Sequence, residues 1–281
     1  VVVEAVRGLG ATQRRGAQSD TTVTVLGAAL GHRSPHVRLV AWEALGAFPE
    51  REAVAHLLAR YEDEDAPPAR AAALLALARL RAPSALGAIA RARESRDLVE
   101  RKGAATAAAA LPSAEALPLL LALADDDHPK VSAEALAGLA RHAGDAGDAG
   151  DVDNEARAKL RAALDSSDSG VRLAAAMALR EIATAQDVPA LQLAALSSTG
   201  DAGPETRFEV ARTLARIPDE GARRTLAKMA REDVDPYVRR VARGLLAELG
   251  RDAELLAEEA QREADERAGA TVAEGPATPV S

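Results

Sequence analysis

The stretch "DVDPYVRRVARGLLAELG", residues 233–250, contains a polar turn, a proline and an amphipathic helix in that order. Asp235 precedes Pro236, and proline is tolerated in the first helical turn because its missing N–H has no helical partner there. A polar side chain just before it caps the free N–H donors of the same turn. The stretch therefore predicts a helix that begins at Pro236.

Six other segments resemble this stretch, four of them with a proline at the same position. They align on the position of Arg239, which we call the Arg slot. The slot is Arg in six of the seven copies, and Ser132 is the exception. The Arg residues are Arg38, Arg70, Arg101, Arg172, Arg207 and Arg239. Successive slots lie 32, 31, 31, 40, 35 and 32 residues apart, and Leu9 matches Leu45 in one further, incomplete copy. A period in this range is typical of helical repeats.

Each copy contains two helices. Apolar residues eight and eleven positions after the Val that precedes the Arg slot lie on one helical face, and a shorter amphipathic stretch such as "REAVAHLLARY" separates consecutive copies. We call the shorter stretch the first helix of a hairpin and the helix with the Arg slot its second helix. One hairpin cannot cover its own apolar face, so stacked hairpins build one continuous core.

The composition agrees with an all-α fold. Apolar residues make up 48% of the 281 residues but aromatic residues only 2%, so the core is expected to consist of Ala, Leu and Val. Ala, Leu, Arg and Glu favour helices. The chain has no Cys, and its net charge of −8 argues against broad nucleic-acid binding.

The repeats resemble the HEAT-repeat family, in the short bacterial form related to phycobilisome-lyase repeats. The pattern that carries the resemblance is D-x-x-P-x-V-R-x-x-A-x-x-A-L, at Asp233, Pro236, Val238, Arg239 and Leu246 among others. The resemblance implies an α-solenoid of about eight two-helix repeats with the second helices on the concave side. It also implies a structural ladder between neighbouring repeats, formed by the Arg slots and the acids Asp126, Asp201 and Asp233.

We expect two regions in the chain. Residues 1–250 form the solenoid, with an incomplete first repeat and an acidic loop at 143–154. Asp145, Asp148, Asp151 and Asp153 offer oxygen ligands to a hard cation, but their spacing fits no EF-hand, so we interpret the segment as a flexible acidic loop. Residues 251–281 carry three basic and eight acidic residues and are expected to form a charged helix or cap and a disordered tail. This tail has the charge to fold back on a basic surface.

No catalytic motif is present in the sequence. His32 and His36 flank a proline in a turn and lack a third ligand, and no phosphate loop or nucleophile elbow occurs. We therefore expect no enzyme, no catalytic residues, no cofactor and no metal site. Without a signal peptide or membrane segment, a cytoplasmic protein is expected. The chain begins at Val1 with a partial repeat, which favours a fragment of a longer protein.

Basic residues on the second helices favour a protein partner, in particular an acidic peptide, on the concave face. The candidate partner-binding residues are Lys102, Arg141, Arg180, Arg212, Arg216, Arg240 and Arg243. The alternative is that they are solvated or paired with acids of adjacent repeats. The sequence predicts a non-enzymatic scaffold for protein–protein interaction. Two other functions stay open from the resemblance: an accessory array of a longer metallopeptidase or peptidyl-prolyl isomerase, and a bilin lyase-like maturation factor.

Overall fold

The computed structural model describes residues 2–13, 20–48, 51–143, 150–196 and 203–250, and all side chains in these ranges except those of 12, 13, 20, 51, 52 and 150–153. The acidic side chains expected at 144–153, the ladder residue Asp201 and the tail 251–281 lie outside this description. The described residues are helical or in turns and contain no strand. They divide into two compact units, Val1–Ala183 and Thr184–Ser281.

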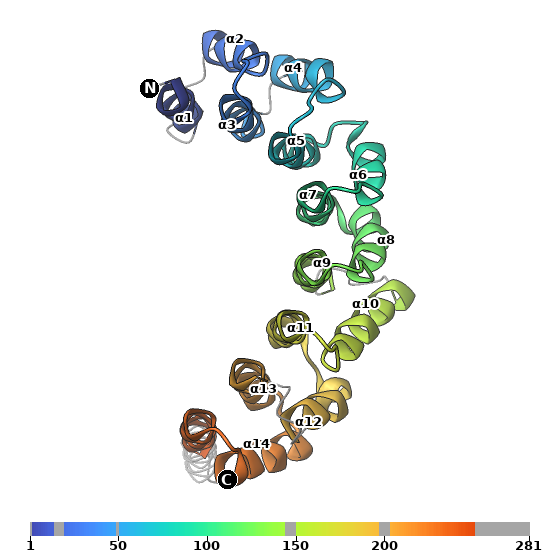
Figure 1. The fold of residues 1–281 in the computed structure, drawn as a ribbon. Coiled ribbons are helices and arrows are strands. Elements are labelled where there is room, and N and C mark those ends of the chain that lie inside the picture. Colours follow the sequence, from blue (N-terminus) through green and yellow to red (C-terminus); the bar gives the residue numbers. More distant parts are fainter. Residues whose placement is uncertain (1, 14–19, 49–50, 144–149, 197–202, 251–281) are drawn as a thin grey trace, which may run out of the picture. The chain divides into compact units, whose positions relative to one another are not determined.

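Unit 1 consists of two rows of helices (Figure 1). The second helices of the hairpins are α1 (Val2–Gln13), α3 (Pro35–Leu45), α5 (Pro67–Arg79), α7 (Leu98–Ala108), α9 (Pro129–His142) and α11 (Ser169–Ile182). The first helices are α2 (Asp20–Ala29), α4 (Arg51–Tyr61), α6 (Ala85–Arg93), α8 (Ser113–Ala124) and α10 (Gly150–Ala163). Each second helix packs on the next one, and Figure 1 shows this row on the inner side of unit 1.

Unit 2 continues the same alternation of first and second helices. It contains the short 3-10 helix η1 (Ala185–Asp187), α12 (Val188–Leu196), α13 (Pro204–Arg216), α14 (Glu220–Glu232) and a helix over residues 236–250. Here α12 and α14 are first helices, and α13 and the helix 236–250 are second helices. In the described part of the chain, seven helix pairs thus follow the single helix α1. The predicted all-α solenoid class with about eight repeats is confirmed.

The sequence places the helix starts through proline and aspartate. Helices α3, α5, α9 and α13 begin at the recurring prolines, and proline also starts the helix 236–250. Where proline is absent, the side chains of Asp97 and Asp168 accept hydrogen bonds from the first free backbone N–H groups of α7 and α11. Both devices serve N–H groups that lack a partner within the helix.

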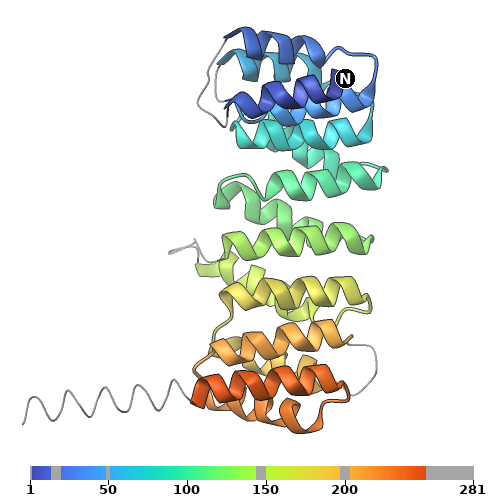
Figure 2. The ribbon, with the colours of Figure 1, turned by 90° about the vertical axis from the view of Figure 1, so that its left-hand side faces the viewer.

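The core lies between the two rows and is built mainly from Ala and Leu. Leu45, Leu74, Leu77 and Leu136 are among its fully buried side chains. Small residues let the second helices approach closely: a Cβ added to Gly103 of α7 would lie 2.4 Å from the Cβ of Ala71 in α5. Figure 2 shows the second helices of unit 1 stacked side by side. None of the described helices combines the length and apolar character needed to cross a membrane.

Candidate functional site

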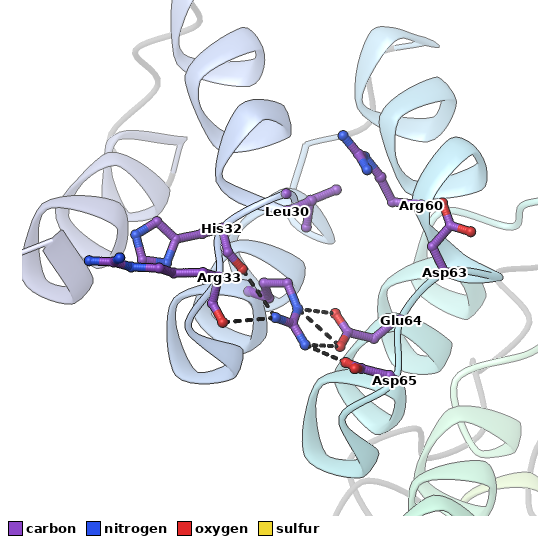
Figure 3. A pocket seen from close by; sticks show the side chains of 9 residues that line it. Leu30, His32, Arg33, Arg60, Asp63, Glu64 and Asp65 are labelled. Atoms are coloured by element: carbon purple, nitrogen blue, oxygen red, sulfur yellow. Dashed lines mark hydrogen bonds and ion pairs between the residues drawn. The ribbon is translucent and has the colours of Figure 1, made fainter.

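The ion pair between Arg38 and Glu64 joins two consecutive repeats. Arg38 comes from α3, and Glu64 lies in the turn before α5. The Nε of Arg38 donates to Glu64 Oε2 at 3.0 Å and its Nη2 donates to Oε1 at 2.8 Å, while the indole N–H of Trp42 donates to Oε2 at 3.0 Å. Figure 3 shows Glu64 and Asp65 beside a cavity of about 240 Å³ that Arg38 also lines. Since the side chains of Arg38 and Glu64 are only 14% and 2% exposed, water screens this pair little.

The environment of Glu64 favours its ionised form. Burial by itself raises the pKa of a carboxyl group, but the hydrogen bonds from Arg38, Trp42 and the amide of Ala66 together outweigh burial here. The pKa of Glu64 therefore lies below its ordinary value. In return, the hydrogen bond to Glu64 raises the pKa of Arg38. The pair is a charged link between repeats at neutral pH.

The same link recurs twice with aspartate as the acid. Arg101 Nε donates to Asp126 Oδ2 at 2.7 Å, and Arg207 Nε donates to Asp233 Oδ2 at 2.9 Å. For Asp126, burial opposes ionisation, but hydrogen bonds from Arg101 and the His128 amide lower its pKa below the ordinary value. In these two links the acid lies at the position that the repeat pattern reserves for Asp, and Glu64 occupies that position in its own repeat.

The link made by Arg70 takes its acid from a different position. The residue at the Asp position of the next repeat is Ser95, which has no carboxylate. Arg70 pairs instead with Glu100 in the first turn of α7, and the Ser95 hydroxyl donates to the same carboxylate. Glu100 in the helix thus supplies the negative charge that is missing at Ser95 before the helix.

The Arg slot also fastens the turn of its own repeat. In five repeats its Nη1 donates to the backbone carbonyl six residues earlier. The acceptors are His32 for Arg38, Glu64 for Arg70, Ser95 for Arg101, Ser166 for Arg172 and Asp233 for Arg239. The repeat pattern of the sequence predicts only a role between repeats for the Arg slot. A hydrogen bond to a backbone carbonyl cannot be predicted from residue types, because every residue has a carbonyl.

Within the described residues, no carboxylate link is recorded for three slots; the acid expected for Arg172, Asp201, lies outside these residues. Ser132 is buried and its hydroxyl donates to the carbonyl of Ala124 at 2.8 Å, so it keeps a backbone contact without a charge. Arg172 donates to the carbonyls of Ser166 and Ser167, and its Nε is buried without a hydrogen-bond partner. Arg239 donates to the carbonyls of Asp233 and Val234.

The basic residues expected to bind a partner differ in their surroundings. Lys102 lies 3.6 Å from Glu134, Arg180 lies 3.0 Å from its neighbour Glu181, and Arg243 donates to the carbonyl of Ala230. Arg141 and Arg216 are exposed near the ends of α9 and α13. These five side chains therefore lie in separate local surroundings.

Two of the seven, Arg212 and Arg240, join two aromatic residues on unit 2. The rings of Phe208 in α13 and Tyr237 in the helix 236–250 stack with their centroids 5.7 Å apart. The guanidinium of Arg212 lies 5.5 Å from the Phe208 ring centroid, and that of Arg240 lies 5.1 Å from the Tyr237 ring centroid. We call this row of four side chains the Arg–aromatic row.

The position of these two rings contrasts with that of the other aromatic residues. Trp42, Phe48 and Tyr61 are buried in unit 1, whereas Tyr237 is 51% exposed and Phe208 is half-buried. Sequence reasoning missed the row because Phe208 and Tyr237 lie 29 residues apart. One signal for it was available: Arg212 and Arg240 follow their aromatic residues by four and three positions, which places each pair on one helical face.

The described residues offer no metal site. No group of three His or acidic side chains within them has the arrangement to hold an ion. The Nδ1 of His32 accepts a hydrogen bond from the backbone N–H of Ser34, which gives this histidine a role in the turn before α3.

These features define a helical-repeat protein. Residues 1–78 match the family model for HEAT repeats, so this part of the chain consists of HEAT repeats. No curated protein matches the chain by sequence.

The chain is similar to several solved structures, and YibA shares its fold. The Escherichia coli protein YibA is similar with a TM-score of 0.55 and 16% identity, over 84% of this chain and 84% of that one. The CpcE–CpcF complex of phycocyanin lyase from Nostoc sp. PCC7120 has a TM-score of 0.47 and 24% identity, over 57% of this chain and 99% of that one. A designed armadillo repeat protein has a TM-score of 0.43 and 19% identity, over 80% and 98%.

Proposed function

We propose that the protein is a non-enzymatic scaffold that binds a protein partner across the surface of its second helices. The observation that carries this proposal is the stacked pair of Phe208 and Tyr237 on that surface. Aromatic residues and Arg are enriched among the side chains that contribute most to protein–protein binding. In a chain with only five aromatic residues, two at the surface beside two Arg residues indicate a contact surface.

The repeat architecture supports the same function. Its recurring geometry rests on the apolar faces and the Arg links, which leaves outward positions of the second helices for recognition. The basic candidates Lys102, Arg141 and Arg180 lie on second helices of unit 1 and Arg216 on one of unit 2, and each would contribute orientation through charge. In this proposal the ladder residues hold the repeats and make no contact with the partner.

Site-specific photo-crosslinking tests the proposal. A photoreactive phenylalanine derivative replaces Tyr237 in the full chain, and in a matched control it replaces Lys228, which is exposed on the first helix α14. Irradiation in cells of the source organism should give a discrete protein adduct at position 237 and none at 228. Equal adducts at both positions, or no adduct at either, would contradict a binding surface on the second helices.

A further inference from the structure

The Arg–aromatic row combines apolar area with two oriented cations. The ring and guanidinium contacts run in the order Arg212, Phe208, Tyr237, Arg240, and the central ring pair bridges two neighbouring helices of unit 2. The N–H donors of a guanidinium lie in its plane, so contact with a ring face leaves its edge able to bind a carboxylate through two hydrogen bonds. The row therefore presents a donor group on each side of an apolar centre.

The nearby charges leave Arg240 available for an external acid. Arg212 has Glu209 at 3.6 Å, but within the described part of the chain no carboxylate lies at ion-pair distance from Arg240. Asp235, the nearest acid in sequence on the preceding turn, accepts hydrogen bonds from the amides of Tyr237 and Val238. The helices α13 and 236–250 together hold six Arg and three Glu residues, in a chain whose net charge is −8. This local excess of positive charge favours an acidic ligand.

The ring contacts argue for a peptide rather than a single-stranded nucleic acid. Nucleobases bind by stacking on free aromatic faces. Phe208 and Tyr237 each already contact one ring and one guanidinium, which reduces the ring area open to a base. An aliphatic side chain needs only the ring edges and the apolar area around them. Val234, which is exposed on the turn before Tyr237, adds to that area.

We propose that the Arg–aromatic row binds an acidic peptide segment of a protein partner, with carboxylates on Arg212 and Arg240 and an apolar side chain over Phe208 and Tyr237. This inference rests on the proposed scaffold function and names the chemistry of the partner. It also assigns the binding to unit 2, where the stacked rings and both guanidinium contacts lie.

The first experiment selects ligands from a library of random twelve-residue peptides displayed on phage, with the full chain as bait. Enriched peptides are then synthesised with a fluorescent label, and their affinities are measured by anisotropy. The main variant is Arg240→Gln, since Arg240 is exposed and fastens no turn. Its matched control is Arg224→Gln on α14, where Arg224 is 75% exposed. Circular dichroism melting shows that both variants are folded.

We expect enriched peptides to carry at least two Asp or Glu residues around an apolar one. Their affinity should fall about tenfold or more in Arg240→Gln, because a charge-assisted hydrogen bond is lost, and stay within about twofold in Arg224→Gln. Tyr237→Phe should retain binding and Tyr237→Ser should lose it. This set of results supports the inference.

Other outcomes overturn it in distinguishable ways. Enriched peptides that lack acids, or that bind Arg240→Gln as well as the unaltered chain, leave the scaffold function standing and remove the acidic ligand. A thymidine dodecamer that binds more tightly than the peptides and depends on Arg240 makes the ligand a nucleic acid. If peptides bind only a full-length variant in which Glu258, Glu259 and Glu263 are changed to Gln, the occupant is the chain's own tail. No enriched peptide with any form of the chain removes both proposals.

Discussion

Glu64 shows how much one side chain contributes to the contact between two repeats. It accepts hydrogen bonds from Arg38 of the preceding repeat, from the Trp42 indole and from the amide of Ala66 in its own turn. Two of these donors come from α3 and one from the turn before α5, and the carboxylate that they share is 2% exposed. Loss of its charge would leave the guanidinium of Arg38 with the exposed Asp65 as its one acidic partner among the described residues.

Replacement of Glu64 tests this contribution. We expect Glu64→Gln to lower the free energy of unfolding by about 2 kcal/mol, because hydrogen bonds to a buried charged group are lost. Glu62→Gln is the matched control, since Glu62 forms an exposed ion pair with Arg91. The side chain of Arg91 is 62% exposed and that of Glu62 is 72% exposed. Its effect should stay within about 0.5 kcal/mol. Urea denaturation measures both, and equal effects would show that the Glu64 pair behaves as a surface contact.

The pKa values of Glu64 and Asp126 predict how stability depends on pH. Both are lowered in the folded chain, by hydrogen bonds that outweigh burial, so the folded state binds fewer protons than the unfolded state in acid. Their contribution is present above the ordinary values of 4.5 and 3.8 and is lost as the pH falls through the lower folded values. The melting temperature should therefore drop as the pH decreases below about 4.5.

The same variants check that assignment. Melting curves between pH 7 and pH 3 should show a smaller acid-induced decrease for Glu64→Gln than for the unaltered chain, since one of the protons that acid adds has no site. Glu62→Gln should keep most of the original pH dependence. An unchanged slope in Glu64→Gln would mean that Glu64 is not among the groups that titrate on unfolding.

The sequence predicts local features of the fold better than contacts between distant residues. The recurring prolines and the polar residues before them predict helix starts, because capping acts within a few residues of the chain. Glu100 as the partner of Arg70, and Phe208 as the partner of Tyr237, depend on contacts between residues about 30 positions apart. Such contacts follow from the stacking register and side-chain direction, which the repeat pattern fixes only approximately.

At the scale of helices, small residues set how closely the second helices approach. Gly103 of α7 faces Ala71 of α5, and an added Cβ would lie 2.8 Å from the Ala71 Cα, which is backbone. Gly10 meets Ala44 and Gly46 meets Ala76 in the same manner, each against the next second helix. Glycine lowers intrinsic helix stability, so inside α1 and α7 closer packing compensates for Gly10 and Gly103, whereas Gly46 follows the last residue of α3.

Two identical substitutions should therefore have opposite effects. Gly103→Ala should lower the free energy of unfolding by about 1 to 3 kcal/mol, because α5 and α7 must separate to admit the methyl group. Gly244→Ala, in the helix 236–250 where nothing lies within 4 Å of an added Cβ, should raise it by up to about 1 kcal/mol through helix propensity. Chemical denaturation compares them. A stabilised Gly103→Ala variant would show that the helices adjust without loss of packing.

At the scale of the molecule, stability is expected to be local. The helix α7 has its strong contacts with α5, α6, α8 and α9, and α1 has its own with α2 and α3. A stack in which each repeat touches only its neighbours has an energy that is close to a sum over repeats and interfaces. The sequence predicts this organisation directly, since a period of about 32 residues implies it.

Hydrogen exchange tests this locality within unit 1. In Gly103→Ala, amide exchange should become faster in α5 and α7, whereas rates in α1 and α2 should stay within experimental error of those in the unaltered chain. Mass spectrometry of peptic fragments resolves these helices. Faster exchange throughout unit 1 would indicate that the unit opens as a whole.

The variable position of the ladder acid limits how repeats can be exchanged in evolution or in design. Arg38, Arg101 and Arg207 need a following repeat with its acid in the turn, whereas Arg70 uses Glu100 in the following helix. A duplicated or transplanted repeat therefore fits only next to a neighbour with the matching arrangement. Repeats that look alike in sequence therefore pair only with particular neighbours, and the order of the repeats is under selection as well as their sequences.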